Sequence, residues 1–242
     1  MNLPEFLSAA SAAWSLLATD PWRWLLVVLV FLVAVESLMF IPYVGFVVKL
    51  SVAGIVVAQV IAIFAAAATG QSPSPTGMLS AFSLPVSSQF ALASAALLPF
   101  AAGILFLYIK GGPPAIEFFF SNMFKTKPPS PKQFEQFKYV MQAVALPFTF
   151  LAGAVVIKGL SGFAAISAAL SAVVTNWLPV LLLGLLAVAF EWTSAHLPSL
   201  MPKGAAALLG GVLLVAFLAW SFALTYTVSA KVFAPPTAKS AA

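Results

Sequence analysis

The sequence predicts an all-α fold, a polytopic membrane helical bundle forming a single integral membrane domain over residues 1–242, and three observations carry this prediction. Of the 242 residues, 62% are hydrophobic and only 7% are charged, whereas about a quarter of the residues in an ordinary soluble domain are charged. The mean hydropathy is +1.08. Apolar stretches of about 20 residues, enough to cross a hydrocarbon core of about 30 Å, recur along the chain. Lipid is therefore the expected solvent for most of the chain.

The same composition argues against several classes of function. The net charge of +5 comes from Lys and Arg that we expect at lipid headgroups, so we predict no nucleic-acid partner. The chain has no cysteine and a single histidine, His196, and therefore lacks the ligands of thiolate, iron–sulfur or His-rich metal sites. No Walker loop, dinucleotide fingerprint, serine-nucleophile elbow or HExxH motif occurs. We expect no catalytic residue, no metal and no cofactor, and hence no enzyme.

Residues 1–21 are predicted to form an interfacial N-terminal helix that is retained, because the stretch lacks the basic region of a secretory signal. Apolar residues recur at helical intervals over residues 5–18, as in an amphipathic helix lying at a membrane surface. Asp20 and Pro21 have the residue types of an N-cap and a first helical position, so a second helix should begin there.

Six later segments are long and apolar enough to span a membrane. We place them at residues 22–40, 45–69, 89–110, 138–158, 175–192 and 205–231. A further apolar stretch, residues 159–174, is short and rich in small residues. It is expected to be a re-entrant or interfacial helix, with a seventh span as the alternative.

The densest run of charge lies in a predicted basic loop, residues 111–137, where "PPAIEFFFSNMF" has the prolines and phenylalanines of an interfacial helix. Basic loops favour the cytoplasmic side. With six spans, this orientation would put both termini outside, the C-terminal one in the tail of residues 233–242.

The stretch "ESLMFIPYVGFVVK" predicts a helical hairpin over residues 22–69, with Pro42 and Gly45 in the turn. Glu36 lies six residues before Pro42 and Lys49 six residues after Tyr43. Both side chains should therefore lie about 9 Å from the turn on neighbouring helices, where they can form an intramembrane ion pair.

Such a pair has two interpretations. It is either part of a proton or ion site, or a structural pair that fixes the register of the hairpin. Gln59 is the only other strongly polar mid-helix residue that we identify, and it would extend a polar pathway.

The first 85 or so residues resemble a known family. A helix containing tryptophan is followed by a span, the turn "IPYVG", a second span and the stretch "GQSPSPTGMLSAF". This order of elements resembles the YciC-like uncharacterised bacterial inner-membrane proteins, and membrane regions related to glycerophosphoryl diester phosphodiesterases. The matching positions are Ile41, Pro42, Val44, Gly45, Gly70, Pro73, Ser74, Leu79 and Phe82. The resemblance implies a bacterial inner (cytoplasmic) membrane location and supplies no reaction.

This chain departs from the family pattern in two ways: residues 70–89 carry no charge where relatives are usually basic, and no phosphodiesterase catalytic domain is attached. The family pattern places the N-terminus inside, against the basic-loop argument, so orientation stays open.

Small residues predict close helix packing. Ala206 and Gly210, and Ala207 and Gly211, form small-xxx-small pairs, which let helices approach in lipid. The expected function is a non-catalytic integral subunit or scaffold of a larger bacterial membrane assembly, with lipids and other membrane subunits or a second copy as partners. The alternative is a small-solute or ion transporter or channel using Glu36, Lys49 and Gln59.

Overall fold

The structure is a computed structural model that describes residues 1–41, 43–120, 129–196 and 203–234; the side chains of residues 81, 191, 194–196 and 203–208 are not described. Every regular element in these ranges is helical, which confirms the predicted all-α class. The helices are α1 (Leu3–Ala18), α2 (Pro21–Ser37), η1 (Leu38–Phe40), α3 (Gly45–Ala68), η2 (Pro75–Ser83), α4 (Val86–Gly111), α5 (Pro113–Phe120), α6 (Pro131–Ala145), η3 (Leu146–Phe148), α7 (Leu151–Val156), α8 (Gly162–Thr175), α9 (Trp177–His196) and α10 (Lys203–Phe233).

The described part of the chain contains five helices that are long and apolar enough to cross a membrane. They are Pro21–Phe40, Gly45–Ala68, Val86–Gly111, Pro131–Val156 and Leu209–Phe233. A sixth span exists only if α8 and α9 are counted together, because the chain bends by 91° between them. The protein is therefore a multi-pass membrane protein. The predicted fifth span corresponds to α9, and α8 precedes it at a sharp angle.

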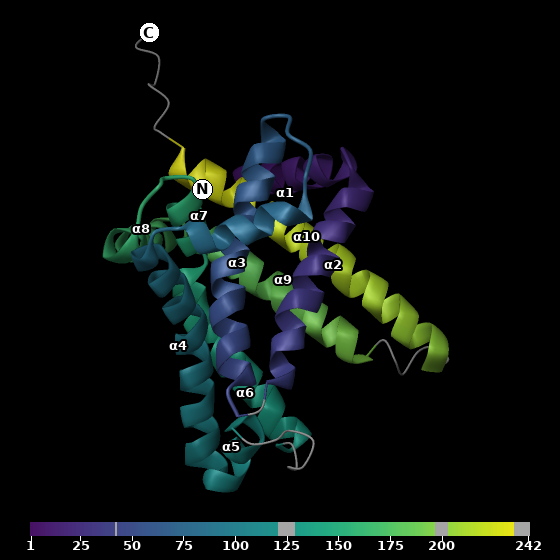
Figure 1. The fold of residues 1–242 in the computed structure, drawn as a ribbon, viewed down its shortest axis with the longest axis vertical. Helices are drawn as coiled ribbons and strands as arrows, with labels where there is room; N and C mark the ends of the chain where they lie inside the picture. The colour runs from purple at the N-terminus through teal and green to yellow at the C-terminus, as the bar shows by residue number, and fades with distance from the viewer. Residues whose placement is uncertain (42, 121–128, 197–202, 235–242) are drawn as a thin grey trace.

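The helices divide into an upright group and a slanting pair (Figure 1). Helices α2, α3, α4 and α6 run along the long axis of the molecule, while α1 lies across one end and α5 sits at the other. Helices α9 and α10 slant away from the upright group. The sparse contacts of α9 with its neighbours α1, α8 and α10 agree with this arrangement.

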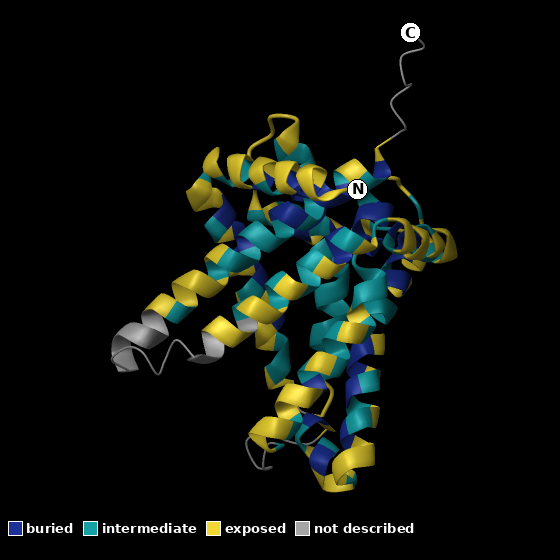
Figure 2. Cartoon of the chain, turned by 180° about the vertical axis from the view of Figure 1, so that it is seen from behind, coloured by how far each residue is buried: buried dark blue, intermediate teal, exposed yellow. Residues whose placement is uncertain are grey.

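The main core lies at the end of the molecule that carries α1. Its largest fully buried side chains include Trp24, Phe64, Phe150 and Leu224, contributed by α2, α3, the η3–α7 connection and α10. Burial is concentrated there, and the outer surfaces of the slanting helices are exposed (Figure 2). Exposed apolar side chains are the normal surface of a protein whose solvent is lipid.

A second cluster of phenylalanines packs at the opposite end, around α5. Phe119 is buried between α4 and α6 and meets Phe100 and Phe137 with ring centroids 5.7 and 5.0 Å away. The helix predicted within the basic loop therefore forms, and part of its aromatic face packs against the protein itself. Phe124 lies outside the described residues.

Helix α1 forms as predicted and is held against the C-terminal helix. Phe6, Ala9 and Ala13 are buried, whereas Leu7 and Trp14, which the sequence also placed on the apolar face, are exposed. The Thr227 hydroxyl donates to the Ala9 carbonyl oxygen at 3.0 Å. One face of α1 thus packs against α10, and Leu7 and Trp14 lie on its exposed side.

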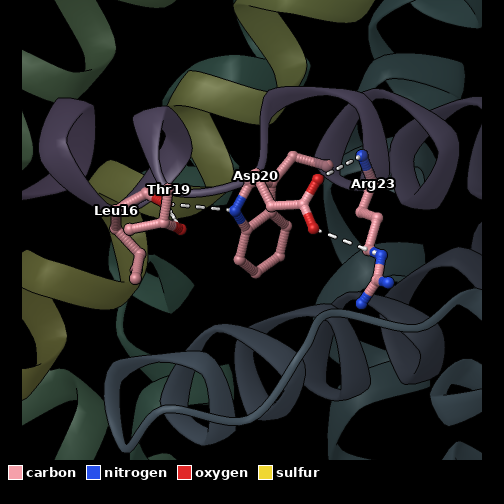
Figure 3. Close-up of polar contacts among 5 residues, drawn as sticks. Leu16, Thr19, Asp20 and Arg23 are labelled. Atoms are coloured by element: carbon pink, nitrogen blue, oxygen red, sulfur yellow. Dashed lines mark hydrogen bonds and ion pairs between the residues drawn. The ribbon is translucent and has the colours of Figure 1, made fainter.

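The start of α2 has the predicted cap, shown in Figure 3. Asp20 accepts a hydrogen bond from the Arg23 backbone N–H at 3.4 Å, and its other carboxylate oxygen lies 3.2 Å from Arg23 Nε. Pro21 occupies the first turn, where its missing N–H costs nothing.

Helix α6 begins at Pro131, seven residues earlier than the span predicted from residue 138. Ser130 and Gln133 form a reciprocal capping box that stabilises this start. The first two turns of α6 are mostly polar, with Lys132, Gln133, Glu135 and Gln136 among them, so the helix is longer than its apolar stretch. A count of apolar residues alone underestimates the length of such a helix.

Candidate functional site

The predicted hairpin is closed by a short 3-10 turn and a glycine. Tyr43 has φ +67°, a left-handed conformation that is uncommon for a bulky residue. A methyl group on Gly45 would lie 2.7 Å from the Met39 carbonyl oxygen and 2.8 Å from that of Leu38. Only glycine lets α3 start this close to the end of α2, which explains the residue at this position. Pro42 lies outside the described residues.

Glu36 and Lys49 meet across this hairpin. The Lys49 Nζ lies 2.7 Å from Glu36 Oε2 and also donates to the Met39 sulfur at 3.0 Å. The side chain of Lys49 is 19% exposed and that of Glu36 is 52% exposed. The pair is therefore a contact between α2 and α3 on the rim of the hairpin, and Lys49 is the more shielded partner.

Gln59 does not join this pair. It follows Lys49 by about ten residues of α3, which is about 15 Å along a helix, and it is half-buried. Neither of the two cavities described below has Glu36, Lys49 or Gln59 in its wall. The three residues predicted as a polar pathway are thus not brought together around either of these spaces.

The larger cavity lies between the upright helices and the slanting pair. Its volume is about 570 Å³, within the range of about 300–1,000 Å³ typical of ligand pockets. Helices α3, α4, α6, α9 and α10 and the η3–α7 connection all contribute to its wall. The wall is mainly apolar, and its most polar side chains are Gln142, Thr149, Ser221 and Thr225.

Gln142 is a second strongly polar mid-helix residue besides Gln59, so the prediction that Gln59 is the only one was wrong. Gln142 lies in α6, within the predicted span 138–158, so the signal was present in the sequence. Pro147 follows in η3, and the helix is interrupted there before α7 begins at Leu151. Proline has no N–H to donate to the carbonyl four residues earlier. This interruption borders the cavity through Leu146 and Phe148.

A second, smaller cavity of about 410 Å³ adjoins the phenylalanine cluster. Its wall is formed by α3, α4 and α5 and is almost entirely apolar, with Tyr108 as its most polar residue. No acid or base lines it. It has the character of a packing gap between the short helix α5 and the long helices α3 and α4.

The glycines of the long helices separate into two kinds, of which Gly210 and Gly211 were predicted as packing residues and Gly54 was not. A methyl group on Gly54 would lie 2.5 Å from the Leu92 carbonyl oxygen, so α3 and α4 pack in close contact there. Gly210 and Gly211 are the opposite case, because a methyl group on either would meet no described atom within 4 Å. The predicted α10 face therefore packs on nothing in the described part of this chain. The side chains of Ala206 and Ala207, like those of Glu191 and His196, lie outside the described residues.

Among the described residues, no three His, Cys, Asp or Glu side chains gather into a group that could hold a metal ion.

Together these features define the chain as a multi-pass α-helical membrane protein with a hairpin ion pair and a central apolar cavity. Comparison with family models, with curated proteins and with solved structures gives no match. The resemblance of the N-terminal part to YciC-like proteins stays a prediction.

Proposed function

We propose that the chain is a non-catalytic integral subunit or scaffold of a larger assembly in a bacterial inner membrane, contacting protein and lipid through its helices. The observation that carries this proposal is the glycine pair on the slanting helix α10. Gly210 and Gly211 have no described atom near the positions that side chains would fill. Glycines that neither pack closely within the chain nor stabilise their helix are explained by a contact with another molecule.

The energetics of glycine make this observation informative. A glycine in a helix interior is less favourable than alanine by about 0.8–1 kcal/mol. Gly54 offsets this cost through the close approach of α4, but Gly210 and Gly211 have no such neighbour. In lipid, small residues at i and i+4 let another helix approach closely and gain van der Waals contact. A helix of a partner subunit or of a second copy is therefore the occupant that accounts for this face.

The surroundings of the glycines fit a helix-binding surface. Leu209, Val212 and Leu213 are exposed next to them, so larger aliphatic side chains stand beside the small residues. A helix surface with side chains of unequal size offers the ridges and grooves into which a second helix packs. Lipid contacts the rest of the apolar exterior.

The test is the composition of the particle that carries the chain. We would extract it into native nanodiscs and measure its mass and co-purifying proteins, for the wild type and for Gly210→Leu and Gly211→Leu. We expect defined partner chains or copies with the wild type and their loss with both variants, without loss of the folded chain. Ala143→Leu, a change at an exposed small residue of α6, is the matched control. A wild-type particle containing one chain and lipid only would overturn the proposal.

The geometry gives less support to a transporter using Glu36, Lys49 and Gln59, because these residues share neither cavity. A flux assay in proteoliposomes decides between the two functions. Transport of a solute or ion that is abolished by Glu36→Gln would favour the transporter.

A further inference from the structure

The central cavity has the wall of a site for a neutral ligand. No Asp, Glu, Lys or Arg lines it, so a charged headgroup placed there would be unpaired in a medium of low dielectric, at a high cost. Most of the wall is aliphatic, contributed by residues such as Leu50, Val57 and Leu183. The bulk of a suitable ligand must therefore be hydrocarbon.

Two hydroxyls of α10 form a polar stripe on this wall. Ser221 and Thr225 are four residues apart and thus lie on one face of the helix. Many hydroxyls of this chain donate to a carbonyl one turn back, as Thr149 does to Leu146 at 2.7 Å. Within the described residues, Ser221 and Thr225 make no hydrogen bond and neither is fully buried. Both can therefore bond a group that enters the cavity.

Gln142 supplies the third polar group, from α6. Its Oε1 is buried and accepts no hydrogen bond from the described residues. A buried acceptor without a donor is costly, and such a group in a native structure calls for an explanation. Gln142 lines the cavity, and the last side-chain torsion of glutamine is soft, so rotation about it can bring this oxygen to a ligand there. A ligand carrying an O–H group would satisfy it.

We propose that the central cavity binds a long-chain neutral lipid alcohol. Its hydrocarbon chain fills the apolar space between the upright helices and the α9–α10 pair, and its hydroxyl donates to Gln142 Oε1. Ser221 and Thr225, which line the same cavity from α10, can donate to an oxygen of the bound ligand. A cavity of about 570 Å³ accommodates one such chain. This site is independent of the partner surface at Gly210 and Gly211, whose residues do not line it.

The direct test uses hexadecanol as the probe, with its methyl ether as the matched ligand that has lost the donor. The purified full-length protein in detergent is labelled with a diazirine-bearing hexadecanol, and each unlabelled lipid is added as a competitor. We expect labelled peptides from α6 and α10. We also expect hexadecanol to compete about three- to tenfold more strongly than the ether, because the net contribution of one hydrogen bond to binding corresponds to a factor of this size in affinity.

Protein variants provide the second arm. Gln142→Leu removes an unsatisfied buried acceptor, so the chain should remain folded without lipid. We expect its affinity for hexadecanol to fall about three- to tenfold, and its affinity for the ether to be unchanged. Ala187→Phe places a ring in the cavity wall and should abolish labelling, whereas Ala189→Phe, on the exposed face of the same helix, should leave it intact.

Two outcomes would overturn the proposal. One is labelling that Ala187→Phe leaves unchanged, which would place the probe elsewhere on the protein. The other is equal competition by hexadecanol, its ether and phosphatidylglycerol with no effect of Gln142→Leu, which would mean that the cavity takes any acyl chain and recognises no hydroxyl.

Discussion

Trp24 and Phe64 stack face to face, with ring centroids 3.9 Å apart and ring planes inclined by only 5°. Both side chains are buried, with Trp24 1% exposed and Phe64 fully covered. The Trp24 indole N–H donates to the Leu16 carbonyl oxygen at 3.1 Å. The Trp24 side chain therefore connects the end of α1, the start of α2 and the C-terminal half of α3.

Replacing this tryptophan should strongly destabilise the fold. For Trp24→Ala we expect a loss of about 3–5 kcal/mol in the free energy of unfolding, because a large buried side chain leaves a cavity. Trp24→Phe keeps a stacking ring but loses the hydrogen bond, and should cost less. Thermal unfolding in detergent measures both, with Trp22→Ala, at a residue 79% exposed, as the control. Equal melting temperatures for Trp24→Ala and Trp22→Ala would contradict the structural role of the stack.

The cap of α2 gives a second prediction. Asp20→Ala removes the acceptor for the Arg23 N–H and should cost about 0.5–2 kcal/mol. Asp20→Asn keeps a capping oxygen and loses only the exposed ion pair with Arg23, which is worth about 0–1 kcal/mol. Chemical denaturation of the two variants in the same detergent separates the contribution of the capping hydrogen bond from that of the ion pair. If asparagine is as harmful as alanine, the ion pair and not the cap stabilises this helix start.

The hairpin ion pair is best measured by a double-mutant cycle over Glu36→Gln, Lys49→Gln and the double variant. The short Lys49–Glu36 contact leads us to expect a coupling free energy of about 0.5–3 kcal/mol, with the double variant less destabilised than the sum of the two single variants. Unfolding in lipid bicelles provides the free energies. Strict additivity would show that the two charges act independently, with Lys49 reaching the headgroup region on its own.

Glycine substitutions should have opposite effects at the two kinds of packing position. Gly54→Ala forces a methyl group to within 2.5 Å of the Leu92 carbonyl oxygen, so α3 and α4 must separate and stability must fall. Gly210→Ala meets no described neighbour and should stabilise the isolated chain by about 0.5–1 kcal/mol through helix propensity. Melting temperatures of the monodisperse chain test both. A destabilised Gly210→Ala chain would reveal an intramolecular contact at that face.

Local features of this fold could be predicted from the sequence. The meeting of Glu36 and Lys49 depends only on counting residues outward from a turn, and helix starts depend on residues such as Asp20 and Pro21. Even the early start of α6 was encoded, because "SPKQ" contains the serine and glutamine of a capping box. Hydropathy alone does not reveal this start, because the capping residues are themselves polar.

The central cavity could not be predicted in the same way. Gln142 and Ser221 belong to helices far apart in the chain, and they line one cavity because of how α9 and α10 slant against the upright group. In helices that are apolar all round, no hydrophobic stripe marks the face that packs on protein. Periodicity therefore carries little information on tilt or partner choice, and it cannot separate the packed Gly54 from the open Gly210.

The docking of α1 on α10 has a consequence for the order of events during synthesis. Thr227 and Lys231 bind backbone carbonyls of Ala9 and Glu5, which precede them by 218 and 226 residues. At about 5–20 residues per second, a ribosome needs about ten seconds or more to make the intervening chain. During that interval Phe6, Ala9 and Ala13 lack the α10 surface against which α1 packs in the folded protein. The native arrangement of this end is therefore completed only after α10 has been synthesised.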